Sequence, residues 1–155
     1  MAEGQPDQAS VGGEPRLRFR DDPPHEEPAV TLDAFLEGQT SATAVRLEAG
    51  DDARALIPHL DRLQLIEVGF PKFRDGRGYS AARILREAGY KGELRASGDV
   101  LVDQMLFMRR CGFDSFAPEA EIDAAALDRA LSRYEFVYQP AADAATPVWK
   151  LRHAR

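Results

Sequence analysis

The sequence predicts one small α/β domain with about five mostly parallel strands that alternate with helices. Short apolar or alternating stretches of strand length recur along the chain, and a segment of helical pattern separates each from the next. This order requires crossover connections and a largely parallel sheet. The chain has 155 residues, which is the length of one domain. Five strands are too few to close an eight-stranded barrel, so we expect an open sheet or an arc resembling part of a barrel.

Residues 1–29 are expected to form a disordered acidic tail. The segment is rich in Gly, Pro, Asp, Glu and Gln, so it cannot bury enough apolar surface to offset the entropy of ordering. Nine acidic residues but only three arginines fall within residues 1–40. The α/β domain is therefore expected to span residues 30–155. It opens with a helical turn between Val30 and Leu36, for which Thr31 is a plausible cap.

Strands are expected where apolar and polar residues alternate or where a short apolar run occurs. They are residues 43–48, 63–70, 93–97, 113–117 and 135–139, with one more around Trp149. Helices are expected between them, at residues 51–59, 79–88, 100–110 and 123–134. Asp51 and Asp52 are candidate N-caps of the first of these helices and Asp99 of the third, and Gly89 and Gly112 are expected to end two helices. The helix at 100–110 is apolar around most of its girth, so we expect it to be deeply buried.

Composition excludes several classes of protein. No apolar run approaches the roughly 20 residues that span a bilayer, and the polar start MAEGQPDQAS lacks the apolar stretch of a secretory signal. The single cysteine cannot form an internal disulfide. Basic residues are interleaved with acids, and no nucleic-acid-binding motif is present. We therefore expect a cytoplasmic protein that binds neither membrane nor nucleic acid.

Open parallel sheets bind ligands beyond the carboxyl ends of their strands, which here selects the loops at 69–78, at 97–99 and around 117–118. The first loop carries Lys72, Arg74 and Arg77 just before a helix start. Helix N-termini favour anions, and arginine binds oxyanions bidentately. We predict a small-anion site there, completed by the N–H groups at Ser80 and by Arg95. The alternative is a solvated surface turn whose arginines pair with nearby carboxylates.

Asp75 and Asp99 are the candidates for acid–base catalysis in these loops. Asp103 and Gln104 follow at the start of the next helix and are candidate ligand-binding residues. The alternative is structural, with Asp99 as a cap and Asp103 near the positive end of the helix dipole.

Other motifs are weaker. Residues 76–81 fit G-x-G-x-x-A, but several residues separate Gly76 from the strand, which disfavours a dinucleotide site. Residues 78–82 nearly match the nucleophile elbow G-x-S-x-G, but the long loop lacks the required sharp turn. Cys111 lies beside two arginines that would activate it, yet a small buried hydrophobe is the favoured role. The three histidines are scattered, so no metal site is expected, and no cofactor is assigned.

Two stretches, FPKFRDGRGYSAARILREAGYKGELRASGDVLVDQ and FMRRCGFDSF, resemble a bacterial family of unknown function. Members of this family carry the label of an oxidoreductase involved in sulfite reduction. The resemblance covers residues 42–140 and implies a link to assimilatory sulfite reduction, but it supplies no mechanism. The expected function is an accessory or partner protein of sulfite reductase. The alternatives are an enzyme or sensor for a small sulfur oxyanion or a phosphate-containing ligand, and an oxidoreductase with a bound flavin or nicotinamide.

Overall fold

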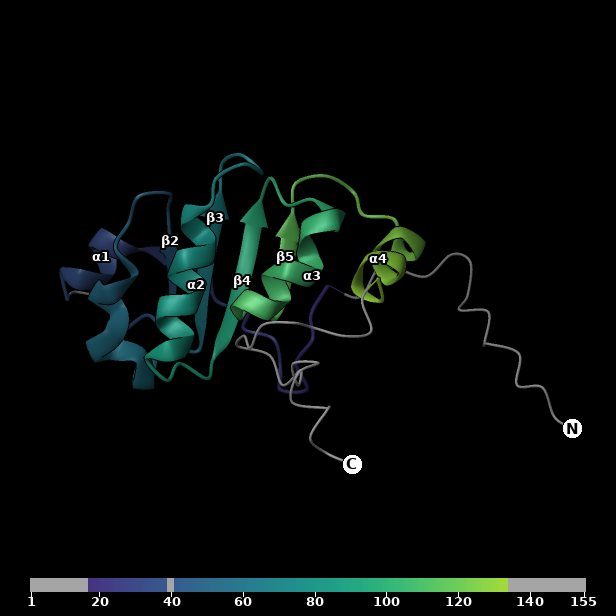
Figure 1. Cartoon of the computed structure of the whole chain (residues 1–155). Helices are drawn as coiled ribbons and strands as arrows, with labels where there is room; N and C mark the ends of the chain where they lie inside the picture. Colours follow the sequence, from purple (N-terminus) through teal and green to yellow (C-terminus); the bar gives the residue numbers. More distant parts are fainter. Residues whose placement is uncertain (1–16, 39–40, 134–155) are drawn as a thin grey trace, which may run out of the picture.

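The structure, a computed structural model, describes residues 17–38 and 41–133. Within them five strands form one sheet and helices alternate with the strands (Figure 1). The strands are β1 (Val30–Thr31), β2 (Ala44–Leu47), β3 (Leu65–Phe70), β4 (Glu93–Gly98) and β5 (Ser115–Pro118). The helices are α1 (Leu32–Leu36), the 3-10 helix η1 (Ala53–Arg62), α2 (Arg77–Glu87), α3 (Val102–Cys111) and α4 (Ala124–Leu131). The predicted α/β class is confirmed, and the strands expected at 135–139 and around Trp149 lie outside the described residues.

The order of the strands across the sheet is their order along the chain, β1-β2-β3-β4-β5, and all neighbours run parallel. Each connection therefore steps to the next strand in the same direction. Because such crossovers are right-handed, this stepping places the connecting helices on one face of the sheet. Figure 1 shows α2 and α3 lying across that face. The sheet is open, as predicted, and its other face carries none of these helices.

The core lies between the sheet and the helices. Ile66, Val68 and Phe70 alternate along β3 on the helix side and are each at most 3% exposed. The Phe70 ring contacts the rings of Tyr79 and Phe113 edge-on, with centroids 5.6 and 5.8 Å apart. Each such side chain contributes about 1.5–3 kcal/mol by leaving water, so β3 is the central support of the fold.

Two predicted helix caps are confirmed. The side chains of Thr31 and Asp52 accept hydrogen bonds from main-chain N–H groups in the first turns of α1 and η1. The helix predicted at 51–59 takes the 3-10 form and contains Pro58, which lacks the N–H of a regular helical turn. The prediction that Asp99 caps α3 is wrong, because the N-cap is Leu101 and makes no side-chain cap bond.

The prediction that α3 is deeply buried is also wrong. The helix packs through one side only, where Met105 and Met108 are fully buried. Leu101, at its start, and Phe107 on its outer side are 41% and 60% exposed. The helix carries apolar side chains around more of its circumference than its one packed face can bury. No helix among the described residues is long and apolar enough to cross a membrane.

Residues 17–29, here named the strap, were expected to belong to the tail but lie against the domain. Arg18 bridges antiparallel to Ser115, so the strap begins as an additional edge next to β5. Leu17 and Phe19 pack against the core, and the Phe19 ring meets Phe116 at 6.1 Å. These two apolar side chains supply the burial that anchors the segment. Residues 1–16 lie outside the described part of the chain.

The side chain of Arg86 joins the loops at the amino edge of the sheet, where the parallel strands begin. From α2, its guanidinium donates five hydrogen bonds, to the main-chain oxygens of Tyr90, Gly92 and Gly112 and to the carboxylate of Asp114. Burial lowers the pKa of Arg86, and the charge of Asp114 opposes that shift. One side chain therefore ties the end of α2 to the chain before β4 and to the turn that follows α3.

Candidate functional site

The loops after β3 and β4 meet at the carboxyl edge of the sheet, where the arrows of Figure 1 end. The main chain of Phe73 is held there from both sides. Its N–H donates to the Asp99 carboxylate at 2.9 Å, and its carbonyl oxygen accepts from the side-chain amide of Gln104 at 3.0 Å. Asp99 in turn donates its own N–H to the carbonyl of Phe70 at 2.8 Å. These bonds fix the loop and present the Phe73 ring outward, 37% exposed.

Asp75 and Arg77 are paired with each other. The Asp75 carboxylate accepts from the main-chain N–H of Arg77 at 3.0 Å and from its guanidinium at 2.6 Å. These hydrogen bonds hold the pKa of Asp75 at about 2. A carboxylate with so low a pKa is a weak proton acceptor near neutral pH. The Asp75 carboxylate also occupies the N-terminus of α2, the place where a bound anion would lie.

Lys72 and Arg74 belong to the same loop and are exposed. The Arg74 guanidinium lies 5.4 Å from the centre of the Phe73 ring, which is cation–π contact. Among the ion pairs of the described residues, none involves Lys72 or Arg74. Two predicted ligand-binding residues therefore present uncommitted positive charge beside an exposed ring.

Arg95 does not join the residues of this loop, because its side chain is on the face of the sheet opposite the helices. Its neighbours Leu94 and Ala96 point into the core, so strand alternation turns Arg95 the other way. It pairs with Glu67 and Glu93, at 3.5 and 3.2 Å. The register places Arg46, Glu67 and Arg95 directly opposite one another on β2, β3 and β4. The result is a cross-strand row of alternating charge.

The remaining predicted residues also lie apart from the loop. The helix α2 begins after Gly76, so Ser80 stands inside it and is exposed. Asp103 is exposed on the first turn of α3 and pairs with Arg133 at 3.5 Å. The structure thus brings together Lys72, Arg74, Asp75, Arg77, Asp99 and Gln104, and separates Ser80, Arg95 and Asp103 from them.

An exposed aromatic surface lies beside the loop, formed by Phe73, Tyr79 and Phe107. The Tyr79 ring lies 5.4 Å from Phe107 on its outer side and 5.6 Å from the buried Phe70 on its inner side. Tyr79 therefore supports Phe107 from below, and the main chain of Phe73 is bonded to Gln104, which lies one helical turn before Phe107 on α3. Sequence reasoning missed this surface. The sequence did carry one signal, because α3 has more apolar residues around its circumference than one packed face can bury.

Cys111 lies near the same surface and is half-buried at the end of α3. Burial raises the pKa of its thiol, although Arg83 and Arg110 act in the opposite direction. A thiol with a raised pKa is less reactive, which agrees with the structural role favoured from the sequence. The described residues hold no group of three or more His, Cys, Asp or Glu side chains that could bind a metal ion.

Comparison with known proteins identifies one family. A family model described as a bacterial protein of unknown function (DUF934) matches residues 44–149. That range contains β2 to α4, the loop at the carboxyl edge and the aromatic surface. No curated protein and no solved structure matches the chain.

Proposed function

The chain belongs to the bacterial family of unknown function DUF934, and from this premise we propose that it is an accessory protein that docks on the assimilatory sulfite reductase. The sulfite pathway comes from the resemblance of the stretches at residues 70–104 and 107–116. The observation that carries the docking role is the aromatic surface on α2, α3 and the loop between β3 and α2.

The composition of this surface suits a protein interface. Aromatic rings and arginine are enriched at the centres of interfaces, where a few well-supported side chains supply most of the binding energy. Phe107 is 60% exposed and rests on Tyr79. Burying one such ring under a partner contributes about 1.5–3 kcal/mol. Lys72 and Arg74 stand at the rim, where uncommitted charge directs an acidic partner into register.

The positions of the predicted ligand-binding residues also favour docking over a small-anion enzyme. Such an enzyme needs its cations and its acid–base group to converge on one point. Arg95 is on the other face of the sheet, and Arg77 is occupied by Asp75. The Asp99 carboxylate and the side-chain N–H of Gln104 both bond to the main chain of Phe73, so they position an exposed ring. The side-chain oxygen of Gln104 is buried and has no hydrogen-bond partner among the described residues.

The test measures association of the full chain with purified sulfite reductase by biolayer interferometry. We expect binding that Phe107→Ser weakens at least tenfold and Phe73→Ser weakens less, because Phe73 is the less exposed ring. Ile57→Ser is the matched control, since Ile57 is 41% exposed on η1, away from this surface. A deletion strain should also reduce sulfite more slowly. Lack of association, together with an unchanged rate of sulfite reduction in that strain, would reject the proposal.

A second candidate function is supported by Lys72 and Arg74 alone. Two exposed cations on one loop, next to the N-terminus of α2, could hold a small oxyanion. Calorimetric titration with sulfite, sulfate and phosphate tests this reading. Heat that disappears in a Lys72→Ala/Arg74→Ala variant would favour it, and the absence of heat at millimolar anion would leave docking as the role of these charges.

A further inference from the structure

The part of the chain that builds the aromatic surface is basic, although the chain as a whole is acidic. Residues 70–110 hold nine Lys and Arg against five Asp and Glu, a surplus of four positive charges. The whole chain has 20 basic and 26 acidic residues and a net charge of −6, which leaves −10 on the remaining residues. A surface built from such a segment attracts acidic partners.

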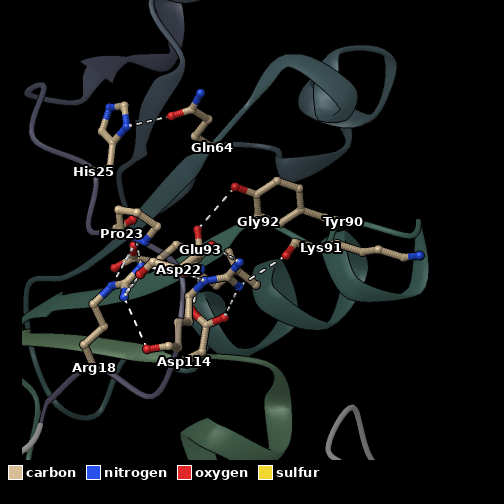
Figure 2. Close-up of polar contacts among 12 residues, drawn as sticks. Arg18, Asp22, Pro23, His25, Gln64, Tyr90, Lys91, Gly92, Glu93 and Asp114 are labelled. Carbon is tan, nitrogen blue, oxygen red and sulfur yellow. Dashed lines mark hydrogen bonds and ion pairs between the residues drawn. The ribbon is translucent and has the colours of Figure 1, made fainter.

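One pair of cations lies at the carboxyl edge, on the loop between β3 and α2. Lys72 and Arg74 are exposed there and take part in none of the ion pairs of the described residues. The amino edge of the sheet is different, because its Arg18 donates to the Asp22 carboxylate at 2.7 Å and to Glu93 at 3.2 Å (Figure 2). Carboxylates of the chain therefore balance Arg18, whereas the two loop cations are left for a partner.

A second pair of cations lies beyond the rings, further along the two helices. Arg83 follows Tyr79 by one turn of α2, and Arg110 follows Phe107 by one turn of α3. Burial raises the pKa of the Cys111 thiol and the charges of Arg83 and Arg110 oppose that shift, so both cations lie near the same thiol. The ion pair of Arg83 on α2 joins side chains that are 74% and 65% exposed. Such a pair holds its guanidinium only weakly.

The acidic residues nearest the aromatic surface already have partners. Asp75 and Asp103 each pair with an arginine, at 2.6 and 3.5 Å. The Asp99 carboxylate accepts from the main-chain N–H of Phe73 at 2.9 Å. The rings are therefore flanked by cations at both ends, and the carboxylates of the same region are bonded to other groups.

We propose that the partner segment docking on the aromatic surface is a short acidic stretch, with an apolar side chain between two groups of carboxylates. The apolar side chain covers the rings of Tyr79 and Phe107. One group of carboxylates meets the two loop cations, and the other meets Arg83 and Arg110. Because Arg83 lies six residues after the start of α2, about 9 Å along the helix axis, the two groups are separated by a similar length. This partner chemistry rests on the docking role proposed above, which leaves the make-up of the docking segment open.

The test titrates the full chain at low salt with the capped peptide Asp-Asp-Gly-Phe-Gly-Asp-Asp, followed by NMR chemical shifts of the aromatic rings. The matched neutral probe has asparagine in place of each aspartate. We expect the acidic peptide to bind about tenfold more tightly than the neutral one, because surface charges attract strongly when little salt screens them. Lys72→Ala/Arg74→Ala and Arg83→Ala should each weaken binding of the acidic peptide about threefold. Phe107→Ser should weaken it about tenfold, because the apolar contact is lost.

The control Arg54→Ala/Lys91→Ala removes two exposed cations outside the aromatic surface, on η1 and before β4, and should leave the affinity unchanged. Equal binding of the two peptides, or an equal loss in the control and in Lys72→Ala/Arg74→Ala, would overturn the proposal even if the chain binds sulfite reductase. The expected pattern without binding to the reductase would reject that enzyme as the partner and support the acidic contact. A dimer that forms with rising chain concentration and that Phe107→Ser abolishes would assign the surface to a second copy, which also overturns the proposal.

Discussion

Replacing Arg86 by alanine tests whether one side chain holds the amino edge of the sheet together. The side chain donates five hydrogen bonds, four of them to main-chain oxygens of Tyr90, Gly92 and Gly112 and one to Asp114. Each hydrogen bond contributes about 1 kcal/mol net, and the two to Gly112 share one acceptor, so the sum is about 3–5 kcal/mol. Because small domains are stable by only about 5–15 kcal/mol, Arg86→Ala should remove a large part of the free energy of unfolding.

Removing the Arg86 side chain leaves no buried charge without a partner. Asp114 keeps an ion pair with Arg20 at 2.7 Å and a hydrogen bond from the N–H of Leu94 at 2.9 Å. The loss is therefore set by unsatisfied carbonyls, and Arg86→Lys should recover only part of it. An ammonium keeps the charge but cannot place donors on acceptors in three different segments.

The assay is urea unfolding at pH 7 followed by circular dichroism, with the slope of the transition checked for constancy. Arg83→Ala in the same helix is the control. Arg83 is 74% exposed and contacts only Glu87 within the described hydrogen bonds, so its urea midpoint should not change measurably. If Arg86→Lys were as stable as the wild type, charge alone would account for the role of Arg86 and the reasoning from donor geometry would be refuted.

Three further predictions concern the carboxyl edge. Gly98→Ala should cost at least about 2 kcal/mol of stability, measured by thermal unfolding, because the φ of Gly98 is +95° and a Cβ there would lie 2.5 Å from a main-chain oxygen of β3. Gly76→Ala is the control, because a Cβ at Gly76 would have no atom within 4 Å. The pKa of Asp75 is lowered to about 2, so its contribution to the stability of the folded state is present above the ordinary carboxyl pKa and is lost as pH falls toward 2. The urea midpoints of Asp75→Asn and wild type should therefore differ at pH 5 and converge at pH 2. A difference that stays constant with pH would contradict the assignment. Asp99→Ala should speed hydrogen exchange of the Phe73 amide at least tenfold, and an unchanged rate would exclude the 2.9 Å bond that holds this loop.

The secondary structure was predictable because its signals are local. Alternation identified β2, β3 and β4 within one or two residues of their ends, and Thr31 and Asp52 were recognised as caps. Such signals act over a few residues, so they are present in the chain before it folds. Asp99 was misjudged for the same reason. As a helix-start residue it looks like a cap, but its carboxylate bonds to Phe73, which lies 26 positions earlier.

Part of the site was also within reach of the sequence. Strand alternation around Arg95 places it opposite Leu94 and Ala96, so its separation from the loop follows from a pattern already visible. The strap was harder to predict. The apolar positions Leu17 and Phe19 alternate with arginines as in an edge strand, but the acidic, proline-rich context outweighed two apolar residues.

The sequence by itself determined the class of the fold, the order of its elements and the loop that carries the exposed cations. Only the tertiary structure decided which distant groups meet: the strap with β5, Arg86 with Gly112, and Tyr79 with Phe107. The physical reason is that helix and strand patterns express the interactions of near neighbours, whereas these pairings depend on packing between segments whose separation along the chain sets no geometry. The open sheet stands as predicted, and the aromatic surface beside the exposed cations at its carboxyl edge became visible only when the chain was folded.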